Sequence, residues 1–169
     1  MNIRRLELKD APLMLAWMHD DNVTKYLSAD FSSKTICDAE EFIKKSWNDK
    51  NNVNLAIVSD EDVYMGTVSL KQIENGSAEF AVVCSSEAMG RGYSWFGMKA
   101  IIEKAFNELG LESVYWCVLR DNTRAVRFYD RHNFHEALDV PQKILSRYEE
   151  MKNLKWYSVL KSDDFNCLP

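Results

Sequence analysis

The chain has 169 residues, 46 % of them hydrophobic and 28 % charged, with a formal net charge of -5 at pH 7. This is the usage of an ordinary globular domain, and the length suffices for one domain with its own core. The acidic balance disfavours nucleic acid as a partner, because phosphate backbones bind basic surfaces. No apolar run is long enough for a signal peptide or a membrane span, so we expect a cytoplasmic protein without a membrane partner.

Cysteine and histidine spacing predicts neither disulfides nor a metal site. Without a CxxC pair, the cysteines read as reduced thiols. Without an HExxH pair, the histidines suggest no zinc ligands. The residues concerned are Cys37, Cys84, Cys117, Cys167, His19, His132 and His135.

The first third of the sequence predicts one strand and two helices. The stretch NIRRLEL alternates as a strand does. A helix follows over 10–21 with Asp10 as its N-cap. After an irregular polar segment at 22–33, apolar residues spaced i, i+3, i+4 and i+8 predict a second helix over 38–49.

Three strands come next, over 52–60, 61–73 and 77–84. The Asn75-Gly76 pair between the last two is a hairpin signal. The stretch MGRGYS then leads into a helix that Gly110 ends as its C′ residue.

The last third predicts three strands around one helix. Strands are expected over 113–119, 134–140 and 154–160, and a helix over 121–133. Residues 141–151 read as an insertion. The whole order indicates a single α/β domain over 1–169, with a mixed, largely antiparallel central sheet of about seven strands flanked by helices.

The glycines at 90 and 92 stand where a helix begins. A helix N-terminus carries unpaired N–H groups and positive partial charge, so bare backbone there can hold a phosphate. The alternative is that both glycines only make a tight turn. A Walker loop and a dinucleotide-binding fingerprint do not fit, because the GK[ST] sequence and the preceding parallel strand unit are missing.

A second group of candidates lies in DNTRAVRFYDRHNF. Asn122 stands at the start of a predicted helix, and Tyr129 lies further along it. Taken alone, this pattern favours a helix cap for Asn122 and a core aromatic for Tyr129 over functional roles.

Together, AEFAVVC, MGRGYS and NTRAVRFYDRHNF resemble the GNAT superfamily of acyl-CoA-dependent N-acetyltransferases. The resemblance covers nearly the whole chain. The stretch LAWMHDDNVTKYL looks like the branch with ribosomal-protein N-terminal alanine acetyltransferases. That branch also acetylates antibiotics, polyamines and amino sugars, so the resemblance does not fix the acceptor.

The resemblance implies acetyl-CoA as the co-substrate and assigns residues to it. Asn122 would hydrogen-bond the pantetheine arm, and Tyr129 would point at the thioester sulfur. The backbone of Val82 and Val83 would pair with the pantetheine amides. The residues expected to hold the pyrophosphate are Gly90, Arg91, Gly92, Tyr93 and Ser94.

The sequence departs from the family pattern at three places. Met89 stands where Gln or Arg is frequent, and Ser94 stands where Gly or Ala is usual. Asn133 replaces a common glycine, and like glycine it tolerates the left-handed conformation at a helix end.

Acetyl transfer to an amine needs a proton donor for the leaving thiolate and a base for the amine. Tyr129 suits the first role, with Glu79 as the candidate base, direct or through water. A main-chain N–H near Val83 could serve the oxyanion. The alternative for Glu79 is a solvent-facing strand position.

The acceptor side is expected around the irregular segment 22–33. Trp17, Tyr26 and Phe31 could form a wall for the acceptor, although core packing explains Trp17 and Phe31 equally well. Acidic residues could attract a cationic amine, but ordinary solvated surface explains them better. They are Asp20, Asp21, Asp30, Glu149 and Glu150.

The sequence thus predicts transfer of an acetyl group to a primary amine by direct attack in a ternary complex. A small metabolite amine such as an amino sugar is favoured as acceptor. The alternatives are a protein N-terminus as acceptor, or a non-catalytic acyl-CoA-binding module on the same fold. The strand edge at Lys155–Leu160 could pair across a homodimer.

Overall fold

The sheet of the computed structural model has six strands in the same order as in the chain, β1 to β6. Neighbouring strands are antiparallel except β4 and β5, which are parallel. The predicted mixed, largely antiparallel sheet is confirmed, with six strands instead of about seven. The structure describes residues 1–148 and 151–163. The strands are β1 (Asn2–Arg5), β2 (Val53–Val58), β3 (Tyr64–Glu74), β4 (Ser77–Cys84), β5 (Ser113–Leu119) and β6 (Leu154–Leu160).

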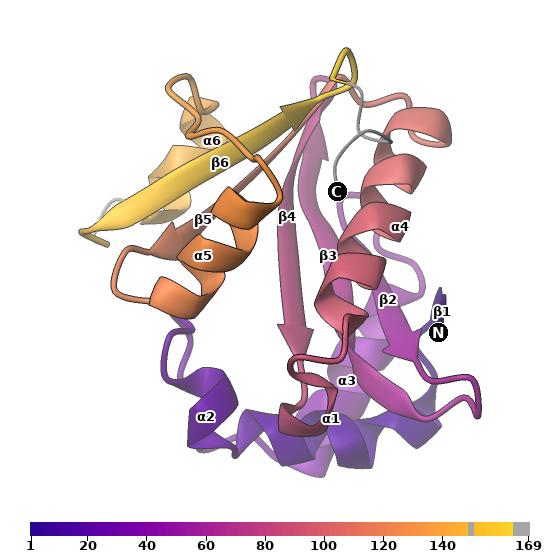
Figure 1. Cartoon of the computed structure of the whole chain (residues 1–169). Helices are drawn as coiled ribbons and strands as arrows, with labels where there is room; N and C mark the ends of the chain where they lie inside the picture. Colours follow the sequence, from indigo (N-terminus) through magenta and orange to yellow (C-terminus); the bar gives the residue numbers. More distant parts are fainter. Residues whose placement is uncertain (149–150, 164–169) are drawn as a thin grey trace.

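Helices cover both faces of this sheet (Figure 1). One face packs against α4 and α5 through the larger hydrophobic cluster, and the other packs against α1 and α3 through the smaller one. The α-helices are α1 (Ala11–Met18), α2 (Asp21–Thr24), α3 (Ile36–Ser46), α4 (Tyr93–Asn107), α5 (Thr123–Arg131) and α6 (Gln142–Leu145). Single 3₁₀ turns are η1 (Leu8–Asp10), η2 (Ser86–Ala88) and η3 (Ser146–Tyr148).

The strand expected over 134–140 is wrong. Only Glu136 forms a bridge, to Tyr157 of β6, and the Ala137 N–H donates to the Trp156 carbonyl at 3.0 Å. Leu138 is 97 % exposed, so the second half of this stretch has no apolar face to bury, and Pro141 cannot donate to a ladder. The bridge nevertheless covers part of the β6 edge that we expected to be open.

Turn residues lie where the sequence placed them. Asn75 and Gly76 both have positive φ, 51° and 74°, as a tight hairpin requires. Gly110 after α4 (φ 66°) and Asn133 after α5 (φ 56°) take the left-handed conformation that ends a helix. These local predictions are confirmed.

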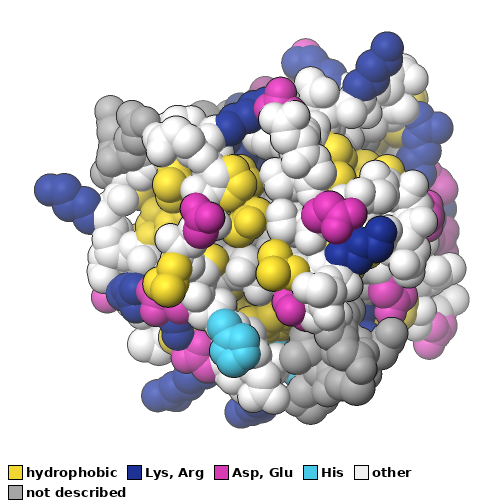
Figure 2. All heavy atoms as spheres, turned by 90° about the horizontal axis from the view of Figure 1, so that it is seen from above, with side chains coloured by type: hydrophobic (Ala, Val, Ile, Leu, Met, Phe, Trp, Pro, Cys, Tyr) yellow, Lys and Arg dark blue, Asp and Glu magenta, His cyan; other side chains and the backbone are white. Residues whose placement is uncertain are grey.

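The surface seen from above mixes acidic, basic and hydrophobic side chains over one face of the molecule (Figure 2). Within the described residues, no helix combines the length and the apolar character that crossing a membrane requires.

Candidate active site

The two parallel strands in the middle of the sheet separate after a short common ladder. Pairing of β4 with β5 runs from Ser77↔Ser113 to Glu79↔Tyr115. β4 continues to Cys84 along β3, while β5 continues to Leu119 along β6. In Figure 1, β5 and β6 lean away from β4, with α5 in front of them. Beyond Glu79, one edge of β4 therefore has no strand partner in the described chain. We call this divergence the parting.

The glycine stretch lies just past the end of β4, where α4 begins. Gly90 and Gly92 have φ of 76° and 87°, and Gly92 is the N-cap of α4 without a side-chain cap. A Cβ at Gly90 would meet nothing within 4 Å. The glycines are thus required by the backbone conformation and not by crowding. Ser94 ties this turn to the parting, because its hydroxyl donates to the Cys84 sulfur at 3.2 Å.

Basic side chains flank this helix start. Arg91 is exposed, and its guanidinium carbon lies 5.6 Å from the ring centroid of the buried Tyr93. Arg124, in the first turn of α5, contacts the sulfur of Met89. Sequence reasoning missed Arg124, because only the fold brings the first turn of α5 beside the glycine stretch. Bare amides, a helix N-terminus and two guanidinium groups make this place suitable for phosphate.

Asn122 is the N-cap of α5, since its side-chain oxygen accepts from the Ala125 N–H at 3.2 Å. The capping alternative therefore holds for the oxygen. The side-chain amide of Asn122 still has N–H groups, which remain available to a ligand in the parting.

Tyr129 lies on the α5 face of the sheet, 6 % exposed. Its ring packs against those of Trp116 and Tyr157, with centroids 5.4 and 5.1 Å away. Burial raises the pKa of Tyr129 above its usual range, helped by the neighbouring Tyr157. The hydroxyl therefore stays protonated at neutral pH. The core-aromatic alternative therefore holds for Tyr129, and its role at the thioester sulfur stays a prediction.

Trp116 carries an unpaired polar atom at the same place. It follows Tyr115, the last residue of β5 that pairs with β4, and its ring packs edge-on against Phe80 at 5.7 Å. Its indole Nε1 is buried and has no hydrogen-bond partner among the described residues. Such a group is costly to leave unpaired, so an acceptor that reached it would stabilise it.

Glu79 is 3 % exposed, which excludes the solvent-facing alternative. Its carboxylate forms an ion pair with Arg147 and accepts a hydrogen bond from the Tyr148 hydroxyl. Both partners belong to η3, 68 and 69 residues further along the chain. A role as base would require one of the two oxygens to be released.

Two further side chains complete this cluster on the α1 and α3 side of the sheet. Lys71 of β3 is the cross-strand partner of Glu79, and burial lowers its pKa. Burial, reinforced by the charge of Glu79, raises the pKa of the Cys117 thiol on β5 to about 12. Burial also raises the pKa of Tyr148, so its hydroxyl is a neutral donor to Glu79. Sequence reasoning found only Glu79 of this group.

The expected acceptor wall is divided between core and surface. The Trp17 indole donates to the Tyr64 hydroxyl at 3.0 Å, and the Trp17 ring packs edge-on against Phe31 at 5.3 Å. Both rings thus contribute to the smaller core cluster. Tyr26 is exposed, with the Lys25 ammonium 5.1 Å from its ring centroid.

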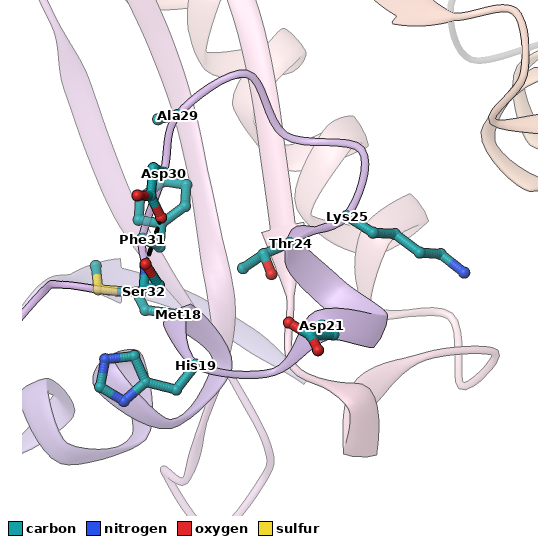
Figure 3. Close-up of a pocket in the computed structure, with 9 residues that line it drawn as sticks. All are labelled: Met18, His19, Asp21, Thr24, Lys25, Ala29, Asp30, Phe31 and Ser32. Atoms are coloured by element: carbon teal, nitrogen blue, oxygen red, sulfur yellow. Dashed lines mark hydrogen bonds between the residues drawn. The ribbon is translucent and has the colours of Figure 1, made fainter.

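A cavity of about 340 Å³ opens beside this wall (Figure 3). Phe31, Asp21 and Asp30 belong to its lining, and Asp30 accepts from Ser32. Asp20 instead caps α2 and accepts from Ser86, which fastens α2 to η2. Glu149 and Glu150 lie outside the described residues, as does Cys167. The described residues contain no group of three or more His, Cys, Asp or Glu side chains that could hold a metal ion.

A family model described as an acetyltransferase (GNAT) domain matches residues 1–135. The chain belongs to the GNAT acetyltransferases. The predicted family and enzyme class are confirmed, whereas the alanine acetyltransferase branch stays a prediction.

Relatives of similar length share about a quarter of the residues. An uncharacterized N-acetyltransferase p20 of Bacillus licheniformis is 25 % identical and covers 96 % of this chain and 94 % of its own. The acetyltransferase PseH of Campylobacter jejuni is 23 % identical, covering 99 % and 96 %. A spermidine N(1)-acetyltransferase of Vibrio cholerae is also 23 % identical, covering 91 % of each chain.

Solved structures agree with the fold. The crystal structure of spermidine N-acetyltransferase from Vibrio cholerae, in complex with CoA and spermine, superposes with a TM-score of 0.80 at 22 % identity over 95 % of both chains. A GNAT acetyltransferase from Bacillus anthracis gives 0.75 at 19 % identity, again over 95 % of both.

Proposed function

We propose that this chain, as a single catalytic domain, transfers the acetyl group of acetyl-CoA to the primary amine of a small molecule. The parting carries this proposal, since it leaves the edge of β4 open between a helix start suited to phosphate and the buried hydroxyl of Tyr129.

The residues present fit coenzyme A. Gly90, Gly92 and the first amides of α4 would hold the pyrophosphate, with Arg91 and Arg124 supplying positive charge. The backbone of Val82 and Val83, on the open stretch of β4, would pair with the pantetheine amides. The Asn122 amide would donate to the same arm, and Tyr93 and Ser94 would contribute main-chain N–H groups. Two further roles are needed for the transfer step, an acid for the leaving sulfur and a base for the amine.

Acetyl-CoA supplies an activated acetyl thioester when bound. Tyr129 would donate its proton to the leaving sulfur, and its raised pKa keeps that proton in place until then. The same apolar surroundings would raise the basicity of a thiolate formed there, which offsets the weaker acidity of the tyrosine. Glu79 would take the amine proton, directly or through water, after one oxygen leaves Arg147 or Tyr148. Direct attack needs both substrates held together.

A small amine is supported as acceptor by the Vibrio cholerae relative, whose name gives spermidine as its substrate. An amino sugar is a small amine of the same kind. Contacts of the acceptor with Trp17, Tyr26 and Phe31 stay predictions.

The test is turnover of acetyl-CoA with a panel of amines by Tyr129→Phe, with Tyr157→Phe as the matched control. Tyr157 lies in the same aromatic cluster, but its hydroxyl is bound to Asp130. Tyr129→Phe should lower kcat about 100-fold or more while the Kd of CoA changes less than about twofold. Tyr157→Phe should retain kcat within a few-fold. Unchanged turnover in Tyr129→Phe would remove Tyr129 from the mechanism, and absence of CoA binding by the parent would reject the function.

A further inference from the structure

The polar cluster at the parting carries more positive than negative charge. Lys71, Glu79 and Arg147 come from β3, β4 and η3, and they meet where the β4–β5 ladder ends. Among residues 1–148 and 151–163, Glu79 is the carboxylate that pairs with this cluster, and it does so with Arg147. The neutral groups around them, Tyr148 and Cys117, hold their protons because burial raises both pKa values. Among the described side chains of the cluster, one positive charge is left over.

Lys71 is the side chain without a partner. It lies directly across the ladder from Glu79, on the same face of the sheet, yet within the described residues it makes neither an ion pair nor a hydrogen bond. It is half-buried, and desolvation lowers its pKa, although the charge of Glu79 opposes this shift more than the charge of Arg147 adds to it. An ammonium group in this position is incompletely compensated, so an anion brought to it would be bound strongly.

Arg147 is available to the same anion. Its side chain is 38 % exposed, whereas that of Glu79 is 3 % exposed, so the guanidinium lies at the mouth of the cluster. A guanidinium has five donors, and the contact with Glu79 uses one of its nitrogen atoms. Lys71 and Arg147 can thus face one anionic group from two sides.

We propose that the acceptor is an amine that also carries an anionic group, a carboxylate or a phosphate, held by Lys71 and Arg147 while its amine meets Glu79. This inference rests on the proposed function. An acceptor of this kind would place its anion against the two cations and its ammonium against the one carboxylate. A phosphate, with about two negative charges, would offset the surplus charge fully, and a carboxylate would offset part of it. The anion would also draw Arg147 away from Glu79 and release the oxygen that the base role requires. A polycation would meet the surplus charge of Lys71 and is disfavoured.

Matched acceptor pairs test the proposal with acetyl-CoA as donor. Glucosamine 6-phosphate against glucosamine tests phosphate, β-alanine against β-alaninamide tests carboxylate, and spermidine tests a polycation. In at least one pair, kcat/KM should be about tenfold or more higher for the anionic member. Lys71→Gln should bring the kcat/KM ratio of that pair to within about twofold of one. Lys50→Gln, at an exposed position before β2, makes the same charge change elsewhere and should leave the ratio as in the parent.

A binding measurement keeps the test independent of the acceptors chosen. Inorganic phosphate and acetate are titrated by NMR into protein saturated with CoA, which occupies the phosphate site at α4. One of the two anions should bind, and Lys71→Gln should weaken it about tenfold while Lys50→Gln does not.

The proposal is overturned if kcat/KM is higher for uncharged amines or spermidine than for the anionic acceptors. It is also overturned if Lys71→Gln lowers kcat/KM equally for both members of a pair, or if neither anion binds to the CoA complex. Each of these results leaves CoA binding and acetyl transfer intact. Failure of the parent to bind CoA would instead reject the proposed function.

Discussion

Replacing Gly90 by glutamate tests the phosphate site with a control at the other end of the same helix. Gly90 precedes α4 and Gly110 follows it, both have positive φ (76° and 66°), and a Cβ at either position would meet nothing within 4 Å. A side chain in this conformation costs about 1–2 kcal/mol at each site. The helix dipole adds a few tenths of a kcal/mol, favourable for Gly90→Glu and unfavourable for Gly110→Glu. The two variants should therefore be similar in stability.

Their affinities for CoA should differ widely. Two unit charges about 6 Å apart at an effective dielectric constant of about 40 repel by about 1.4 kcal/mol. A pyrophosphate with about two charges would then be bound about 100-fold more weakly by Gly90→Glu. Gly110→Glu lies at the far end of α4 and should bind as the parent does.

Thermal unfolding with and without CoA measures this difference. At about 100 times the parent Kd, CoA adds about 2.7 kcal/mol, or about 5–10 °C in Tm for a chain of this size. The same concentration adds only about 0.4 kcal/mol to Gly90→Glu, about 1 °C, and gives Gly110→Glu the full shift. A full shift in Gly90→Glu would refute the reasoning and leave the glycines as a simple turn.

Three further predictions concern stability and reactivity. Asp10→Ala should lower the free energy of unfolding by about 3–5 kcal/mol, because Arg4 donates to both carboxylate oxygens of the buried Asp10 at 2.8 Å; a loss below about 1 kcal/mol in urea would contradict this. Gly97→Ala should cost about 1–3 kcal/mol, since its Cβ would lie 2.4 Å from Ile57 Cδ1, and adding Ile57→Val should recover most of it; a double variant no more stable than the single one argues against that clash. Cys117, with its pKa raised to about 12 by burial, should react with iodoacetamide at pH 8 more than about a hundredfold more slowly than a free thiol, followed by mass spectrometry. Rapid labelling of folded protein would show that the thiol is accessible and ionised.

Local signals carried most of the fold prediction. The strand at 77–84, the hairpin at Asn75-Gly76 and the helix end at Gly110 each depend on residues adjacent in sequence, and the structure has all three. The strand predicted over 134–140 failed for a different reason, because its pairing depends on the edge of β6, and the sequence does not show how that edge lies. Whether a short alternating stretch becomes a strand depends on the partner edge and on the following proline, which propensity does not weigh.

The site was predicted less completely than the fold. Glu79 stood out as a charge within an apolar strand, but its partners Arg147 and Tyr148 lie in a stretch that read as an insertion. The local sequence does not predict a role for these two residues, because they contact Glu79 across almost 70 residues of chain. Lys71 was equally hidden, because a strand lysine normally faces water.

The parting also bears on how the molecule is held together. The strands β1–β4 and β5–β6 share the ladder from Ser77 to Glu79 and little else within the sheet, so the two halves meet along a seam. An extended ligand that hydrogen-bonds along this seam would join the halves and restrict their relative movement. The segment that carries Arg147 packs over the end of this ladder. A donor bound along this seam would therefore also make the segment that carries Arg147 more rigid.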